Sequence, residues 1–334
     1  MLLLLLMHSL FACTGPEVSK LHGSTMGTSY SVVIPNLPNN ISEQFIQSGI
    51  ESLLEKVNQQ MSTYIKDSEL SQLNQSDASQ WLSVSPELFD VIQSANSISK
   101  QTKGAFDVTI GPLVNLWGFG PAELLVSAMP SDEDINKARQ VVGYHNLQIK
   151  AENRLLRKQF KDLYIDLSAI AKGYGVDAVA SYLDTLGIQD YLVEIGGELI
   201  GKGLSQRGDY WRVAVEKPLS GQRMVDRVID VTDFAVATSG DYRNYFEKDG
   251  VRFSHTIDPR TGRPISHSLA SVTVLSNEAM LADAWATALM VLGEEEGYKL
   301  AEKKQLAAYF LFRQDDGFMS KATSAFTRLT KNSG

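Results

Sequence analysis

Cysteine is almost absent from this sequence of 334 residues, in which Cys13 is the single example. An intramolecular disulfide is therefore impossible. The chain also lacks a phosphate-binding loop, a zinc-type cluster of Cys and His, a nucleophile elbow and a glycine-rich dinucleotide fingerprint in its required context. These absences exclude P-loop nucleotide hydrolases, structural zinc proteins and elbow-type serine hydrolases. Thiol catalysis is excluded as well if Cys13 carries lipid, as its surroundings suggest below.

Acidic residues outnumber basic residues in this chain. The chain has 31 Lys and Arg against 39 Asp and Glu, which gives a net charge of −8. Nucleic-acid-binding proteins normally carry a basic patch, so we expect no nucleic-acid partner. A nucleotide ligand would need a metal ion or a few placed donors to neutralise its phosphates. The content of 43% hydrophobic and 21% charged residues is typical of a globular protein with an ample core, as one large domain or two closely packed ones.

Long apolar runs are missing after the N-terminus, because no later segment reaches the ~18 apolar residues of a spanning helix. The N-terminus combines an apolar run over 1–7 with Leu10-Phe11-Ala12-Cys13 and a polar continuation. This pattern resembles a bacterial lipoprotein signal, although no Lys or Arg precedes the apolar run; a short uncleaved anchor is the alternative. We expect a periplasmic lipoprotein of the inner membrane, with a signal peptide over 1–12, lipidation of Cys13, a tether over 13–22 and a folded domain over 23–334.

The spacing of apolar residues predicts an α+β fold. Periodicity and capping residues predict helices that begin near Ser42, Ser85 and Ser131, and further helices over 171–186, 277–292 and 294–304. β-Rich runs predict strands over 28–34, 191–195, 210–215, 225–231, 251–257, 269–275 and 308–312. Because the strands cluster without strict alternation with helices, we expect largely antiparallel β-sheets packed with helices.

The run His255-Thr256-Ile257-Asp258-Pro259-Arg260-Thr261-Gly262 combines an imidazole with a sharp turn. Such a turn after a strand exposes its polar groups and can place a titratable histidine at the lip of a cleft. The ordinary pKa of histidine, near ~6.5, suits a general base, and Asp258 could orient the ring of His255. The alternative is a polar residue at a strand end with no chemical role.

Asp283 and Thr287 lie one helical turn apart in an alanine-rich stretch, so they share one face of the expected helix. A carboxylate in apolar surroundings is costly unless it is paired. The two side-chain oxygens therefore indicate a site for a hard cation such as Mg²⁺. The alternative is that both residues cap neighbouring backbone.

Two further segments carry candidate ligand-binding residues. In the first, Asp166 ends a strand, Ser168 can cap a helix, and Lys172 lies near the start of that helix, where a phosphate is favoured. The alternative there is a capped helix with a solvated lysine. In the second, Phe106 could stack on a planar ring and Asp107 could accept a hydrogen bond from one.

Several motifs in this order resemble those of the ApbE family of FAD:protein FMN transferases, over about residues 23–312. The motifs are Gly23-Ser24-Thr25-Met26-Gly27-Thr28, Met61-Ser62-Thr63-Tyr64, Gly104-Ala105-Phe106-Asp107-Val108-Thr109, the run 166–173, Glu194-Ile195-Gly196-Gly197, Ala237-Thr238-Ser239-Gly240, His255-Thr256-Ile257-Asp258-Pro259 with Thr261-Gly262, and Asp283-Ala284-Trp285-Ala286-Thr287-Ala288. The resemblance implies an ApbE-like α+β fold.

The resemblance also implies a reaction. The family's enzymes use Mg²⁺ to split FAD and attach FMN through a phosphoester bond to a Ser or Thr of an acceptor flavoprotein, such as a subunit of a membrane redox complex, with release of AMP. Carried over to this sequence, the residues in contact with FAD are Met26, Tyr64, Ala105, Phe106, Asp107, Asp166, Lys172 and Ile257. The same resemblance implies that Mg²⁺ is bound by the Ala169 backbone carbonyl, Asp283 and Thr287, and that His255 is needed for transfer.

Other functions stay open at this level. With water as the acceptor, the same site would be an FAD pyrophosphatase that yields FMN and AMP. A non-catalytic flavin-binding lipoprotein is a second alternative, but storage alone would not need Asp283, Thr287 and His255. A protein-interaction module with a relic site is the third, and the intact motifs argue against it.

Overall fold

The computed structural model describes residues 18–121, 129–219, 224–241, 245–248, 251–315 and 317–330. Cys13 and the expected signal peptide lie outside these residues. Among the helices of the described ranges, none is both long enough and apolar enough to cross a membrane.

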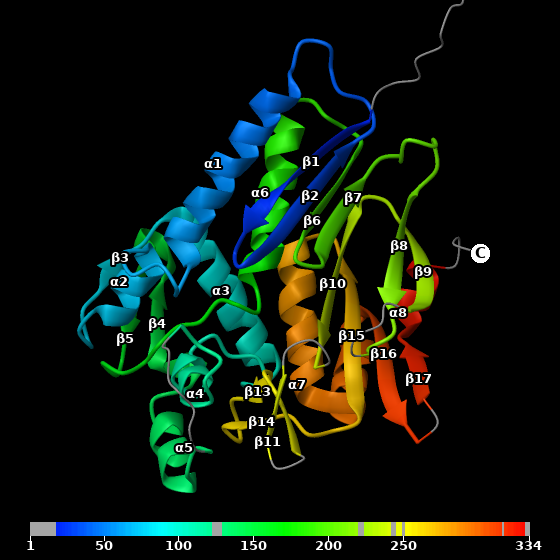
Figure 1. Ribbon diagram of the computed structural model, residues 1–334. Coiled ribbons are helices and arrows are strands. Elements are labelled where there is room, and N and C mark those ends of the chain that lie inside the picture. The colour runs from blue at the N-terminus through cyan, green and yellow to red at the C-terminus, as the bar shows by residue number, and fades with distance from the viewer. Residues whose placement is uncertain are drawn as a thin grey trace, which may run out of the picture.

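An eight-stranded antiparallel sheet forms the centre of the molecule, in the order β1-β2-β6-β7-β10-β15-β16-β17 (Figure 1). Its strands are β1 (Ser19–Thr25), β2 (Thr28–Ile34), β6 (Tyr191–Ile195), β7 (Glu198–Lys202), β10 (Phe234–Gly240), β15 (Leu269–Ser276), β16 (Ala307–Gln314) and β17 (Gly317–Ala322). Smaller sheets are formed by β3 (Leu82–Ser83), β5 (Leu155–Lys158) and β4 (Leu147–Lys150), and by the ribbons β8 (Trp211–Glu216) with β9 (Val225–Val231), β11 (Tyr245–Lys248) with β12 (Val251–Ser254), and β13 (Ile257–Asp258) with β14 (Arg263–Pro264). The predicted α+β class with antiparallel sheets is confirmed.

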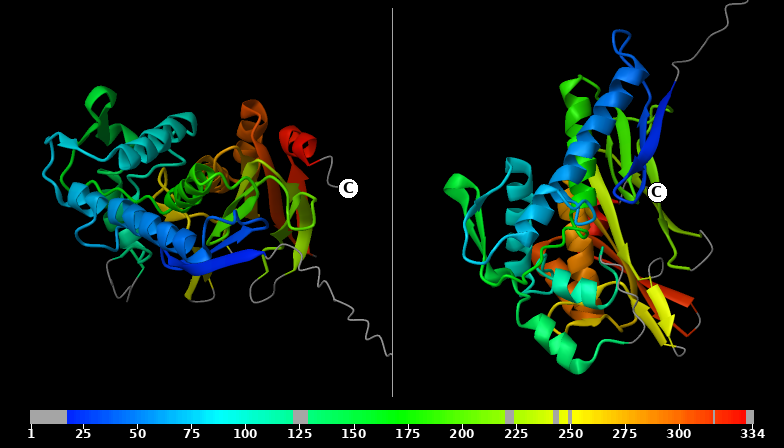
Figure 2. Two further views of the ribbon diagram at one scale, coloured as in Figure 1. Left: turned by 90° about the horizontal axis from the view of Figure 1, so that it is seen from above. Right: turned by 60° about the vertical axis from the view of Figure 1, so that its left-hand side comes forward.

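Some of the helices cover one face of the large sheet (Figures 1 and 2). The helices are α1 (Glu43–Met61), α2 (Glu69–Gln75), α3 (Pro86–Gln101), α4 (Gly111–Leu116), α5 (Asp132–Arg139), α6 (Ala171–Thr185), α7 (Ala279–Lys304) and α8 (Ser324–Leu329), with short 3-10 turns η1 (Tyr144–Asn146) and η2 (Ala151–Asn153). α1 and α6 pack on β1, β2 and β6, and α7 packs on β10, β15 and β16.

The β8–β9 ribbon and α8 pack on the opposite face. Along β16, Ala308 and Phe310 belong to the core under α7, whereas Tyr309 and Leu311 belong to the core under the ribbon. This alternation follows from the two-residue repeat of a strand. The sheet is therefore buried on both faces here, which explains the almost continuous apolar sequence of the strand.

Helix starts agree with the capping residues of the sequence. Ser42, Ser85 and Ser131 each accept a hydrogen bond from a backbone N–H in the first turn of α1, α3 and α5. The helices predicted over 277–292 and 294–304 form the two parts of α7, which are separated by a non-helical Gly293 with φ of 76°. A positive φ at this position is tolerated by glycine without steric cost.

Regular structure begins before residue 23, where the folded domain was expected to start. Ser19 pairs with Ile34 and His22 pairs with Ser31, so the residues from Ser19 onward already belong to the sheet. The β1–β2 hairpin turns at Met26 and Gly27, both of which have positive φ. This is the backbone that a two-residue hairpin turn requires.

Candidate active site

A cavity of about 600 Å³ opens at one end of the large sheet. It is bordered by the β6–β7 turn, the first turn of α6, the part of α7 from Asp283 to Val291, the loop before α4 and the segment after β12. Ten of the predicted site residues line this cavity: Ala105, Phe106, Asp107, Asp166, Ala169, Lys172, His255, Ile257, Asp283 and Thr287. Segments that are far apart in the sequence thus meet in one place.

The crossing of α6 and α7 brings Lys172 close to Asp283. A Cβ atom on Gly173 would lie 2.3 Å from the carbonyl oxygen of Ala279, so only glycine allows this close approach of the two helix starts. Asp177, one turn further along α6, accepts hydrogen bonds from the N–H groups of Ala279 (2.7 Å) and Met280 (2.8 Å). Asp177 therefore caps the start of α7 from a neighbouring helix, a role that the sequence did not reveal.

Lys172 lies between two buried carboxylates. Its Nζ is 3.1 Å from Oε1 of Glu198 and 3.9 Å from Oδ2 of Asp283. Burial disfavours the charged ammonium, but Asp283 and Glu198 outweigh this effect and raise the pKa of Lys172 above its usual range. The solvated lysine of the alternative interpretation is therefore wrong.

Glu198 is the main residue that the sequence missed. It is 5% exposed, begins β7 and follows the Gly196–Gly197 turn, where both glycines have positive φ. Burial raises the pKa of Glu198 to about 7, even though Lys172 favours the charged carboxylate. The signal in the sequence was a Gly-Gly hairpin with a carboxylate directly after it.

Asp283 is both a cap and a potential ligand. It is 4% exposed, and its Oδ2 accepts a hydrogen bond of 3.1 Å from the backbone N–H of Gly173. Burial raises the pKa of Asp283, although Lys172 and Gly173 oppose the shift. The capping alternative is thus partly right: Asp283 caps α6 across the helix crossing, whereas Ser168, expected to cap that helix, does not. The N-cap of α6 is Ile170, without a side-chain hydrogen bond.

The oxygens around Asp283 fit a hard cation. Thr287 lies one turn further along α7 and also borders the cavity. The Ala169 carbonyl, just before α6, receives no hydrogen bond from the residues that the structure describes, because the Gly173 N–H is directed to Asp283. Within the same residues, no group of three or more His, Cys, Asp or Glu could hold a metal. A cation here would therefore have one carboxylate and neutral oxygens, a set that suits Mg²⁺ with retained waters and substrate oxygens.

Two segments, one before α4 and one before α6, contribute Phe106, Asp107 and Asp166 to the lining of the cavity. Phe106 is 3% exposed and belongs to the main core. Asp107 accepts hydrogen bonds from the N–H and hydroxyl of Thr109 through Oδ1, and from the N–H of Tyr144 through Oδ2 (2.6 Å). Asp166 accepts one from the N–H of Ser168 (2.8 Å). Both carboxylates therefore hold the loops that shape the cavity.

Met26 and Tyr64 are not among the residues that line the cavity. Met26 packs against α6, where a Cβ on Gly175 would come 2.9 Å from its Cε. Tyr64 is 68% exposed, and burial of its hydroxyl together with the charge of Asp166 raises its pKa. Tyr64 thus lies near Asp166, at the rim of the cavity.

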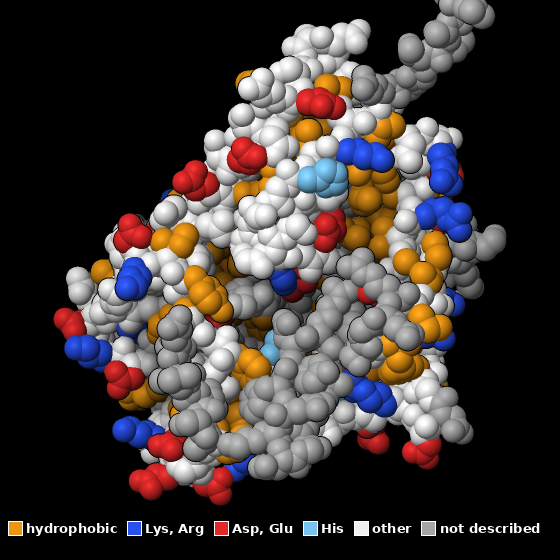
Figure 3. Space-filling model, in the orientation of Figure 1, with side chains coloured by type: hydrophobic (Ala, Val, Ile, Leu, Met, Phe, Trp, Pro, Cys, Tyr) orange, Lys and Arg blue, Asp and Glu red, His pale blue; other side chains and the backbone are white. Residues whose placement is uncertain are grey.

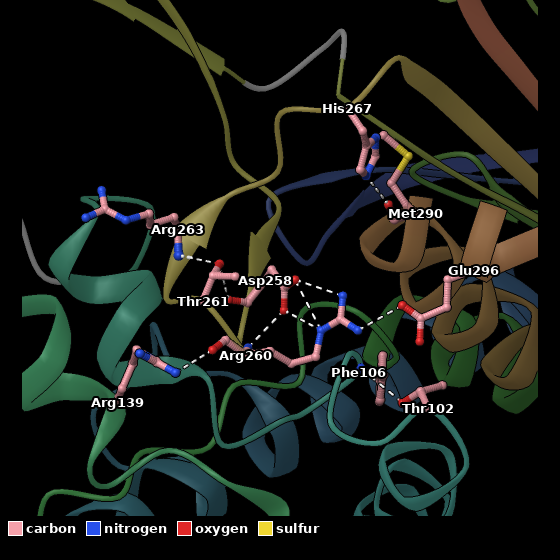
Figure 4. A network of polar contacts seen from close by, with 10 residues as sticks. All are labelled: Thr102, Phe106, Arg139, Asp258, Arg260, Thr261, Arg263, His267, Met290 and Glu296. Atoms are coloured by element: carbon pink, nitrogen blue, oxygen red, sulfur yellow. Dashed lines mark hydrogen bonds and ion pairs between the residues drawn. The ribbon is translucent and has the colours of Figure 1, made fainter. Parts of the chain in front are cut away.

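The turn after His255 is fixed by ion pairs (Figure 4). The guanidinium of Arg260 donates hydrogen bonds to both oxygens of Asp258 and to Glu296 of α7. Arg139 of α5 donates to the carbonyl of Arg260. Asp258 makes no hydrogen bond to His255 among the described residues, so the prediction that it orients the imidazole is wrong. The ring of His255 lies edge-on to Phe119, at 6.4 Å between centroids.

Charged groups of both signs surround this region of the surface. On the face drawn in Figure 3, acidic and basic side chains are interspersed, and neither sign forms one continuous area. A phosphate-containing ligand would therefore meet local donors such as Lys172 rather than a broad positive field.

Comparison with known proteins identifies the fold and the family. A profile of the ApbE family matches residues 26–310. The chain is 50% identical to the FAD:protein FMN transferase of Vibrio cholerae, over 95% of this chain and 94% of the relative, and 44% identical to that of Haemophilus influenzae, over 97% and 95%. The structure of the flavin transferase ApbE from Vibrio cholerae superimposes with a TM-score of 0.87 at 48% identity, over 93% of this chain and 99% of that chain. The apo structure of the flavinyl transferase ApbE from Pseudomonas stutzeri superimposes with a TM-score of 0.86 at 39% identity, over 94% of this chain and 97% of that chain. The chain belongs to the ApbE family.

Proposed function

We propose that this protein is a Mg²⁺-dependent FAD:protein FMN transferase. It would move FMN from FAD to a Ser or Thr hydroxyl of an acceptor protein and release AMP. The observation that carries the proposal is the convergence of Lys172, the Asp283–Thr287 pair and His255 on one cavity of about 600 Å³. The names of the relatives from Vibrio cholerae and Haemophilus influenzae support the same activity.

Lys172 and the first turn of α6 bind the pyrophosphate of FAD in this proposal. The ammonium of Lys172 lies at the positive end of the α6 dipole, where an anion is favoured. The buried side chains of Ala105, Phe106 and Ile257 provide an apolar wall for the flavin, and Tyr64 covers it from the rim. Met26, which packs against Gly175 of α6 and does not line the cavity, would contact only the edge of FAD.

Asp283, Thr287 and the Ala169 carbonyl hold Mg²⁺. When bound, Mg²⁺ supplies positive charge that stabilises the phosphate oxygens and the departing AMP. Because Asp283 also accepts the Gly173 N–H, its carboxylate stays in a fixed position before the ligand arrives. This preorganisation is what an electrostatic site needs.

His255 is the base in this reaction. A neutral ring nitrogen takes the proton of the acceptor hydroxyl, since a hydroxyl is a weak nucleophile at neutral pH. The hydroxyl oxygen forms a bond to the phosphorus of the FMN half, and the bond from that phosphorus to the bridging oxygen breaks. AMP leaves with the electron pair of the broken bond.

The decisive experiment is a mass measurement. Purified protein, FAD and Mg²⁺ are mixed with candidate acceptor domains, and the mass of the acceptor is followed. A gain equal to phosphoester-linked FMN supports the transferase. Free FMN and AMP without acceptor labelling would instead identify an FAD pyrophosphatase, and bound but intact FAD would identify a flavin-binding protein.

We also propose that the chain is anchored to the periplasmic side of the inner membrane through lipid on Cys13, where the acceptor would be a flavoprotein subunit of a membrane redox complex. The lipoprotein-like pattern of the N-terminus supports this proposal. We expect Cys13→Ser to move the protein from the membrane to the soluble fraction of its host. Purified Cys13→Ser protein should keep full FMN transfer, because sheet pairing begins only at Ser19. A wild-type protein found in the soluble fraction with an intact N-terminus would contradict the anchor.

A further inference from the structure

We infer that Glu198 is a positioning residue that holds the Lys172 ammonium away from Asp283 and so leaves Asp283 available for a divalent cation. The inference rests on the cation site proposed above. It assigns a role to a buried carboxylate that the transfer reaction itself does not use.

The distances show which carboxylate Lys172 prefers. Its Nζ donates a hydrogen bond of 3.1 Å to Glu198, whereas the 3.9 Å to Asp283 is too long for one. The Oδ2 atom of Asp283 instead receives the N–H of Gly173 at 3.1 Å. The ammonium is thus drawn to β7, and the hydrogen bond that Asp283 receives among the described residues comes from the backbone.

The β6–β7 turn is shaped for this contact. Glu198 pairs with Ile195 directly across the Gly196–Gly197 turn. A Cβ atom on Gly196 would lie 3.3 Å from Cδ of Lys172, so the turn runs close against the stem of the lysine. The second oxygen of Glu198, Oε2, is buried and has no hydrogen-bond partner among the described residues. Such a carboxylate is costly, and Lys172 is the partner that accounts for its place.

Removal of the Glu198 charge has a specific consequence. Among the described residues, Asp283 is then the one carboxylate within 4 Å of the ammonium. A shift of about 1 Å would convert this 3.9 Å approach into a direct salt bridge. Lys172 would then compete with a cation for the same carboxylate.

The test is a double-mutant cycle on cation binding, without FAD and without turnover. Mn²⁺ affinity is measured by electron paramagnetic resonance for wild type, Glu198→Gln, Lys172→Met and the double variant. We expect Glu198→Gln to weaken Mn²⁺ binding about tenfold in the wild-type background and less than about threefold when Lys172 is Met, because no ammonium remains to move. Glu194→Gln is the matched control. Glu194 lines the same cavity and accepts the N–H of Gly197, but it forms no ion pair with a lysine among the described residues. It should change the affinity less than about threefold.

The outcomes separate this inference from the proposed site. Suppose that Glu198→Gln weakens Mn²⁺ binding equally in the wild-type and the Lys172→Met backgrounds. Glu198 would then act on the cation independently of Lys172, and the inference would be overturned. Wild-type protein that does not bind Mn²⁺, or an Asp283→Ala variant that binds it as tightly as wild type, would refute the cation site instead. Thermal melting establishes that each variant is folded. If Glu198→Gln does not fold, the same cycle uses Glu198→Asp, whose shorter side chain also loses the 3.1 Å contact.

Discussion

The two sides of the cavity are built in different ways. On the charged side, Glu198 and Asp283 are 5% and 4% exposed and are held, with Lys172, by packed core elements. On the rim, Tyr64 is 68% exposed, and His255 lies partly exposed after a short strand. The groups expected to meet phosphate and cation are thus preorganised, whereas the groups expected to meet the flavin edge and the acceptor stand at an open surface. A transferase needs this difference, because a protein acceptor must reach a site whose charges are already in place.

The difference has a local origin. The charged side depends on the contact between the starts of α6 and α7, which Gly173 permits and Asp177 caps. The His255 side depends on a surface turn, which Arg260 ties to Glu296 through a partly exposed ion pair. Exposed ion pairs contribute little to stability, so the link from Arg260 to α7 is weaker than the packed contacts on the charged side.

The largest expected effect is on the charged side. Asp283→Ala should abolish Mg²⁺-dependent FMN transfer, and excess Mg²⁺ should restore little, because the charged ligand is lost. FAD should still bind through its ring contacts, so a flavin-fluorescence titration and the acceptor-mass assay should give different answers.

Thr287→Ala is the matched control for Asp283→Ala. It should be milder, since water can replace a neutral ligand. Transfer by Asp283→Ala at the wild-type rate would locate the metal elsewhere and leave Asp283 as a helix cap for Gly173.

On the rim, His255→Ala should slow transfer by about 10²–10⁴-fold, the usual contribution of a general base. Mn²⁺ affinity should be unchanged, because His255 is not among the proposed ligands. A single-turnover assay with excess enzyme measures the chemical step directly. If His255→Ala transfers FMN normally, another group accepts the proton.

Much of the charged side could be predicted from sequence: its helices and the pair Asp283 and Thr287. The hydrogen-bond and ion-pair partners of its residues could not be predicted. Capping serines, helical periodicity and the Asp283–Thr287 spacing are local signals, and they located α1, α3, α5 and α7. The partners of Asp283 and Lys172 come from other elements, at Gly173 and Glu198. Such contacts between distant segments leave no periodic pattern in one sequence.

The errors have the same cause. Ser168 was expected to cap α6 because of its position, yet Asp283 supplies that hydrogen bond from α7. Asp258 was expected to orient His255 because they are neighbours in sequence, yet Arg260 takes both of its oxygens. The strand β10 was not predicted because its Ala-Val-Ala-Thr-Ser-Gly sequence has small residues, and its pairing with β7 and β15 determines its structure.

A pair of aromatic substitutions sharpens the comparison. Tyr64→Ala should weaken FAD binding by ~1–3 kcal/mol with little change in thermal stability, because the ring is exposed and would pack mainly on the proposed ligand. Phe106→Ala should lower the free energy of unfolding by about 3–5 kcal/mol as well as weaken FAD binding, since it is a core residue. Thermal melts and FAD titrations on both variants test this. If Tyr64→Ala lowers stability but leaves FAD affinity unchanged, Tyr64 is structural.

The smallest effect concerns Asp177, beneath the charged side. Burial raises the pKa of Asp177 to about 6, from an ordinary value of 3.8, in spite of its two hydrogen bonds from the start of α7. The folded protein therefore binds this proton more tightly than the unfolded chain does. Its contribution to the free energy of unfolding is fully present below pH ~4 and is lost as the pH rises through about 6.

Asp177→Asn keeps the size of the side chain and one acceptor oxygen but cannot titrate in this range. The loss of stability that Asp177 is expected to contribute between pH 4 and pH 7 should therefore be absent in the variant. Urea unfolding at pH 4, 5, 6 and 7 measures this difference, with the exposed Asp90→Asn as a control that should follow wild type. If Asp177→Asn and wild type lose stability in parallel over this range, the Asp177 carboxylate is ionised in the folded protein throughout, and the cap on α7 is a charged one.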